Sequence, residues 1–107
     1  MGGKNPSIVF EDCDYNDMLD TVIKSSFTNQ GQICLCSSRI LIEKSIYEKF
    51  KFDFCKKVSE LVLGDPIDPK TEFGAITSRA QYEKILAYVK LSKEQNGSIL
   101  IGGKARK

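Results

Sequence analysis

The residues of this 107-residue chain that could do chemistry gather in one short stretch, residues 27–39, which reads Phe-Thr-Asn-Gln-Gly-Gln-Ile-Cys-Leu-Cys-Ser-Ser-Arg. Two thiols, Cys34 and Cys36, stand there beside a glycine and three side-chain amides. A thiolate is a strong nucleophile, and a loop on a rigid scaffold can present one to a substrate. Cys34 is therefore a candidate catalytic nucleophile. The alternative is that both cysteines are buried small residues, as free cysteines commonly are.

The lack of histidine and the spacing of the cysteines exclude several roles for these thiols. The chain has no histidine, so no Cys–His or Ser–His pair can form within it. Its four cysteines, at positions 13, 34, 36 and 55, form no C-x-x-C pair, and we therefore expect no metal site. A third hypothesis is a thiol redox module built on Cys34 and Cys36. It is the weakest of the three, because a C-x-C spacing strains a disulfide.

Charge and hydropathy argue against several classes of partner. The 16 basic and 14 acidic residues give a net charge of +2, which is too balanced to indicate a nucleic-acid partner. No apolar run approaches the ~18 residues that a membrane span needs. The first residues, Met-Gly-Gly-Lys-Asn-Pro, lack the apolar core of a signal peptide. We expect a cytoplasmic protein with reduced thiols and with neither a nucleic-acid nor a membrane partner.

The elements that would position the thiols alternate between strands and helices. In chain order the patterns predict a strand at 7–10, a helix at 15–27, a strand at 39–43, a helix over 44–62, a loop over 63–77, a helix over 78–95 and a strand at 98–101. Asp14 is a good N-cap, and Ser78 begins a capping box with Gln81. The first strand lacks strict alternation, so we expect it to be buried on both faces. The order predicts an α/β fold, with three α/β/α layers around a mostly parallel sheet.

Apolar side chains at helical spacing predict the core. The second helix has a broad stripe that also contains Cys55, which we interpret as a core residue. The stripe consists of Ile46, Phe50, Phe54, Val58 and Val62. Three strands make a thin core, and apolar strands need neighbours that this chain does not obviously supply. We therefore expect exposed strand edges.

Taken together, these motifs resemble the aldehyde dehydrogenase superfamily over essentially the whole chain. Residues 2–6, Gly-Gly-Lys-Asn-Pro, look like the family's G-G-K-x-P segment, and residues 27–39 look like its cysteine active-site signature. The pieces Ile46-Tyr47-x-x-Phe50, Gly64-Asp65-Pro66, Gly74 with Ser78, and Gly102-Gly103 follow in the family's order. Within the family, residues 32–40 look most like the 2-aminomuconic and hydroxymuconic semialdehyde dehydrogenases.

The resemblance implies a chemistry for this chain. Cys34 matches the family's nucleophile, which forms a thiohemiacetal with an aldehyde; hydride then passes to NAD or NADP, and water hydrolyses the resulting thioester. The backbone N–H of Cys34 can be one oxyanion donor, and Asn29 is expected to brace the loop. The substrate class is a small-molecule aldehyde, here a muconic-type semialdehyde. The full-length enzymes are expected to be homo-oligomers.

Two departures from the family pattern limit what the chain alone can do. The family's catalytic Glu lies two residues before the Gly-Gly pair, whereas only Met1 precedes Gly2 here. No Gly-rich dinucleotide-binding turn exists, so the cofactor-binding residues are unknown and we expect poor NAD(P) binding. We expect residues 1–107 to be the N-terminal part of the family's catalytic domain, without the cofactor-binding domain and inactive in isolation. The alternative is a non-catalytic truncated relic that associates with full-length subunits.

Overall fold

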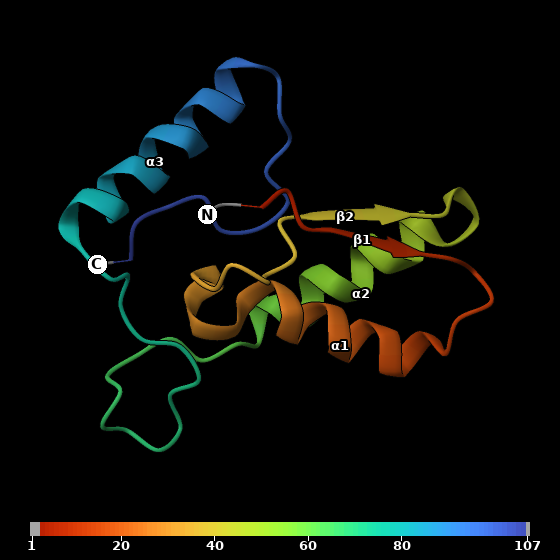
Figure 1. Ribbon diagram of the computed structural model, residues 1–107, viewed down its shortest axis with the longest axis horizontal. Helices are drawn as coiled ribbons and strands as arrows, with labels where there is room; N and C mark the ends of the chain where they lie inside the picture. Colours follow the sequence, from red (N-terminus) through yellow and green to blue (C-terminus); the bar gives the residue numbers. More distant parts are fainter. Residues whose placement is uncertain (1–2, 107) are drawn as a thin grey trace. The chain divides into compact units, whose positions relative to one another are not determined.

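The computed structural model describes residues 3–106, and the chain divides after Gly74 into two compact units (Figure 1). The first unit contains strand β1 (Pro6–Val9), helix α1 (Tyr15–Phe27), the 3-10 turn η1 (Thr28–Gly31), strand β2 (Arg39–Ile42), the 3-10 turn η2 (Lys44–Ile46) and helix α2 (Tyr47–Ser59). The second unit contains helix α3 (Arg79–Glu94). These bounds confirm the predicted helices and the first two strands to within a few residues.

The two strands form a parallel sheet joined by α1. Their register pairs Pro6 with Arg39 and ends with Val9 beside Ile42. This is a β-α-β unit, the connection that parallel strands require. Figure 1 shows α1 and α2 on the same side of the two strands. Parallel pairing together with helix-on-sheet layering confirms the predicted α/β class.

Helix α1 begins and ends where its sequence predicts. The Asp14 carboxylate accepts the Asp17 N–H at 3.1 Å, and so satisfies one of the N–H groups that have no partner within the helix. At the other end the Thr28 hydroxyl donates to the Lys24 carbonyl. The buried side of the helix carries Leu19, Val22 and Ile23.

Among the described residues, one hydrophobic cluster forms the core between the sheet and the two helices. Its buried members are Val9, Leu19, Val22, Ile23 and Phe50, each less than a tenth exposed. The Phe50 ring stacks on that of Phe54 with 5.2 Å between centroids, and Phe27 lies 6.0 Å from Phe54. The predicted apolar stripe of the second helix is therefore a packing surface. The helix ends at Ser59, so Val62 lies beyond it.

Apolar side chains on the other face of the sheet are exposed in the part of the chain that the structure describes. Ile8 is 64% exposed and Leu41 is 52% exposed, although both are apolar. The prediction that the first strand is buried on both faces is thus wrong at Ile8. The reason is that α1 and α2 pack only on the face that carries Val9, and successive residues of a strand point to opposite faces.

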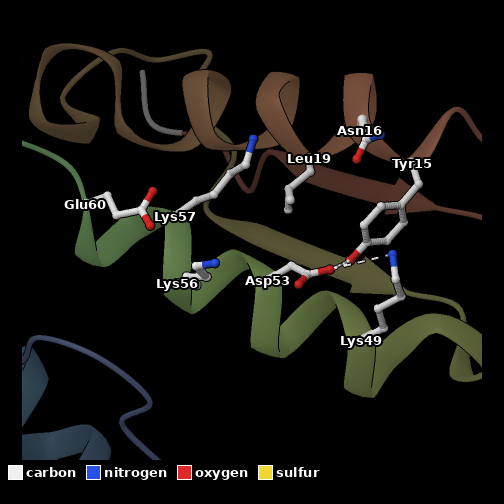
Figure 2. Close-up of a pocket in the computed structure, with 8 residues that line it drawn as sticks. All are labelled: Tyr15, Asn16, Leu19, Lys49, Asp53, Lys56, Lys57 and Glu60. Atoms are coloured by element: carbon white, nitrogen blue, oxygen red, sulfur yellow. Dashed lines mark hydrogen bonds and ion pairs between the residues drawn. The ribbon is translucent and has the colours of Figure 1, made fainter.

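A polar pocket lies between α1 and α2, and Figure 2 shows the residues that line it. The Tyr15 hydroxyl donates to Asp53 Oδ2 at 2.7 Å. Lys49 Nζ lies 3.6 Å from the same oxygen and 3.2 Å from the centroid of the Tyr15 ring. Burial, followed by the hydrogen bond to Asp53, raises the pKa of Tyr15 to about 12. These contacts tie the first turn of α1 to the first half of α2.

The second unit is built on α3. The Ser78 hydroxyl accepts the Gln81 N–H at 3.1 Å, which confirms the predicted cap. The strand predicted at 98–101 is wrong, because the structure gives these residues no strand partner. A strand is stabilised by a neighbouring ladder, and the described part of this unit offers only a helix. Over residues 3–106 no helix is long and apolar enough to cross a membrane.

Candidate active site

The loop that carries Cys34 and Cys36, residues 28–38, is called the thiol loop, and it begins with a sharp reversal of the chain at the end of α1. Asn29, Gln30 and Gly31 have φ values of 52°, 58° and 72°, a run of left-handed residues that favours Gly and Asn. The Asn29 carbonyl accepts the Gln32 N–H at 3.0 Å. The Gln30 amide, oriented with its oxygen toward Gly74, accepts that residue's N–H at 2.9 Å and donates to the Asn29 carbonyl at 2.9 Å. The Asn29 carbonyl thus accepts two of the hydrogen bonds that shape this reversal.

Cys34 lies at the tip of a tight turn. The Cys36 N–H donates to the Ile33 carbonyl at 2.9 Å, which places Cys34 and Leu35 at the two central positions. Both residues are exposed, and Leu35 is 82% exposed. Within residues 3–106 the Cys34 N–H has no hydrogen-bond partner. The turn thus presents a thiol and a backbone donor from the same residue.

The two thiols of the loop lie in opposite environments. Cys34 is exposed, whereas Cys36 is 8% exposed and its S–H donates to the Thr28 carbonyl at 3.5 Å. The hypothesis that both are buried packing residues is therefore wrong for Cys34 and right for Cys36. Cys55 is half-buried on α2 and is not among the residues that pack against the core cluster, so its interpretation as a core residue is wrong.

Three serine hydroxyls anchor the end of the loop. Ser37 Oγ lies 2.6 Å from Ser7 Oγ and 3.1 Å from Ser25 Oγ. The Ser37 N–H also donates to the Ser25 carbonyl at 2.9 Å. Since Ser7 belongs to β1 and Ser25 to α1, the loop is fixed to both elements of the β-α-β unit.

The segment before β1 holds the other side of the loop. Asn5 Nδ2 donates to the Cys34 carbonyl at 2.6 Å, and the Asn5 carbonyl accepts the Ser38 N–H at 3.2 Å. The Lys4 carbonyl accepts from Ser38 Oγ and from Arg39 Nη1, both at 3.1 Å. This role was not predicted from the sequence, in which Asn5 is only the variable position of the G-G-K-x-P motif.

The turn that follows β1 does not fit the pyrophosphate of a dinucleotide cofactor. The turn from β1 into α1, residues 10–14, reads Phe-Glu-Asp-Cys-Asp and contains no glycine. Three carboxylates there would repel a pyrophosphate, and the Asp14 side chain already caps the helix. Among residues 3–106, no group of three His, Cys, Asp or Glu side chains could hold a metal ion.

Comparison with known proteins gives consistent matches. The model of the aldehyde dehydrogenase family matches residues 1–107. Human 2-aminomuconic semialdehyde dehydrogenase is 42% identical over 102 residues, which are 95% of this chain and 21% of the relative. Human 4-trimethylaminobutyraldehyde dehydrogenase is 36% identical over 103 residues, which are 96% of this chain and 21% of the relative.

A solved structure also matches this chain over its full length. The crystal structure of betaine aldehyde dehydrogenase from Staphylococcus aureus in complex with NAD+ superposes with a TM-score of 0.97 and 34% sequence identity. The match covers 100% of this chain and 21% of that one. The chain therefore spans about one fifth of the length of the relatives that it matches.

Proposed function

The chain belongs to the aldehyde dehydrogenase family, and we propose that it is the segment of such an enzyme that carries the catalytic nucleophile, Cys34. Membership rests on the family match over residues 1–107 and confirms the resemblance predicted from the motifs. One observation supports the assignment to Cys34: of the two thiols in the signature stretch, Cys34 is exposed at the tip of a turn, while Cys36 is buried and hydrogen-bonded.

The proposed reaction is the oxidation of an aldehyde to a carboxylic acid. The Cys34 thiolate adds to the carbonyl carbon, a C–S bond forms, and the C=O π electrons move to oxygen, giving the oxyanion of a thiohemiacetal. A bound nicotinamide dinucleotide supplies the acceptor for the hydride that leaves this carbon. Water then hydrolyses the thioester, which breaks the C–S bond and releases acid and thiol. Because turn 10–14 does not fit the cofactor, we propose that its site lies elsewhere in the full-length enzyme.

The contribution of this chain to the addition step is the thiol and the N–H of one residue. An oxyanion develops as Cys34 attacks, and a fixed donor near that oxygen lowers the barrier. The Cys34 N–H suits this role because it is not used in any hydrogen bond within residues 3–106. The similarity to 2-aminomuconic semialdehyde dehydrogenases supports a semialdehyde as the substrate class.

An activated ester tests the nucleophile without cofactor or base. We expect p-nitrophenyl acetate to acetylate Cys34, giving a thioester like the proposed intermediate, detected by peptide mass spectrometry. The variant Cys34→Ser should lose this adduct, and the matched control Cys36→Ser should keep it. Acetylation of Cys36 in preference to Cys34 would refute the assignment.

The open sheet face favours a second candidate, a non-catalytic relic that associates with full-length subunits. Ile8 and Leu41 are exposed on that face, and an exposed apolar patch is typical of a protein–protein interface. Size-exclusion chromatography with light scattering tests this idea. A folded monomer at every concentration, with no binding to the full-length enzyme, contradicts it.

A further inference from the structure

We propose that Asn5 is a positioning residue for the nucleophile, because its side-chain amide fixes the peptide group that follows Cys34. The inference rests on the proposed function of Cys34. Asn5 Nδ2 lies 2.6 Å from the Cys34 carbonyl oxygen, across 29 residues of sequence. No other side chain of residues 3–106 donates to this carbonyl.

Both peptide groups that flank Cys34 are held by hydrogen bonds. The preceding peptide is held through the Ile33 carbonyl, which accepts the Cys36 N–H at 2.9 Å. The following peptide is held through the Cys34 carbonyl, which accepts the Asn5 amide. Since each bond fixes one peptide plane, together they set φ and ψ of Cys34. The directions of the Cys34 N–H and of its Cα–Cβ bond follow from these two angles.

The backbone around Asn5 is shaped to present its amide. Asn5 has φ 32°, a value that Asn, Asp and Gly tolerate better than other residues. Gly3, two residues earlier, leaves room for this side chain, because a Cβ there would collide with Asn5 Oδ1 and displace the amide. The Asn5 carbonyl accepts the Ser38 N–H, so Asn5 bonds the loop at two points, the Cys34 carbonyl within the turn and the Ser38 N–H after it.

The hydrogen bond from Asn5 should affect acylation of Cys34 more than its alkylation. Acylation of Cys34 by an ester passes through an oxyanion and depends on the aim of the Cys34 N–H. Alkylation by iodoacetamide displaces iodide and develops no oxyanion. Loss of the Asn5 amide should therefore slow acylation more than alkylation, whereas a general loosening of the loop would slow or speed both reactions together.

The test measures both rates at Cys34, by peptide mass spectrometry, in four versions of the full chain. Asn5→Gly keeps the left-handed backbone and removes the donor; Asn5→Asp keeps the size and has no N–H to donate. The control Ser38→Ala removes a different bond between the same two segments, that to the Lys4 carbonyl. We expect about fivefold slower acylation in both Asn5 variants, with alkylation within about twofold and the control near wild type.

Two outcomes would overturn the inference. One is an unchanged ratio of acylation to alkylation in Asn5→Gly; the other is an equal loss in Ser38→Ala. Labelling of half-buried Cys13 and Cys55 reports whether each variant keeps its fold. If wild-type Cys34 is not acylated at all, the proposed function fails instead, and this result is distinct from either outcome for Asn5.

Discussion

Removing one oxygen from Tyr15 should loosen the junction of α1 and α2 by a measurable amount. In Tyr15→Phe the ring stays, so its packing and its contact with Lys49 stay as well. The hydrogen bond to Asp53, 2.7 Å long, is lost (Figure 2). Asp53 keeps Lys49 as a partner at 3.6 Å, so its charge is not left without a counter-charge.

The expected loss is about 1 kcal/mol of unfolding free energy. A hydrogen bond to a charged group contributes roughly 1.5–3 kcal/mol when it is well buried. The Asp53 side chain is 30% exposed, and solvent screening reduces that contribution. For a unit of this size, a change of about 1 kcal/mol lowers the melting temperature by about 4–8 °C.

The pH dependence of this loss follows from the raised pKa. The Tyr15 phenol titrates at about 12 in the folded chain instead of 10.0, so folding favours its protonated form. The stabilisation is therefore complete below pH 10.0 and is lost as pH rises through about 12. We expect the difference between wild type and Tyr15→Phe to be constant below that window and to shrink within it.

Urea denaturation at neutral pH and across that alkaline window measures the effect. The matched control is Tyr88→Phe, which removes the same oxygen from a side chain that is 61% exposed on α3. Equal stability of wild type and Tyr15→Phe at neutral pH would refute the reasoning. So would an equal loss in the control, or a difference that grows above pH 10.0.

The remaining predictions concern the core, a cap and turnover. Phe50→Ala should lower the unfolding free energy by about 3–5 kcal/mol in urea denaturation, because it leaves a cavity; an equal loss in Phe50→Leu would contradict that cause. Ser78→Ala should cost about 1 kcal/mol and reduce helical circular dichroism, with Ser78→Asp restoring it. The chain alone should form no NADH from a semialdehyde and NAD+, since neither base nor cofactor turn is predicted within it; clear turnover would disprove this.

The helices were predictable because their signals are local. Asp14 and Ser78 each bond an N–H three residues on, a spacing that is visible in the sequence. The end of α1 was equally readable, since Asn29 and Gly31 favour left-handed backbone. These local signals bound α1 and so mark where the thiol loop begins.

The errors and omissions all involve contacts between distant residues. The apolar run at 98–101 has strand composition, but strand formation depends on a partner that composition does not reveal. Ile8 has the pattern of a buried residue, yet its exposure depends on which face the helices cover. The bond from Asn5 to Cys34 joins residues 29 apart, and no local pattern encodes it.

Because Pro6 pairs with Arg39, the effect of an insertion should depend on where in the chain it is made. The sheet register also sets the placement of Asn5 beside Cys34, since Asn5 directly precedes β1. Extra residues in the turn between β1 and α1 would bulge into solvent and leave that placement intact. One extra residue between Asn5 and Pro6 would shift the amide by about 3.3 Å and turn it to the opposite side of the chain. Insertions should therefore be tolerated in the turn between β1 and α1 and should be damaging between Asn5 and Pro6.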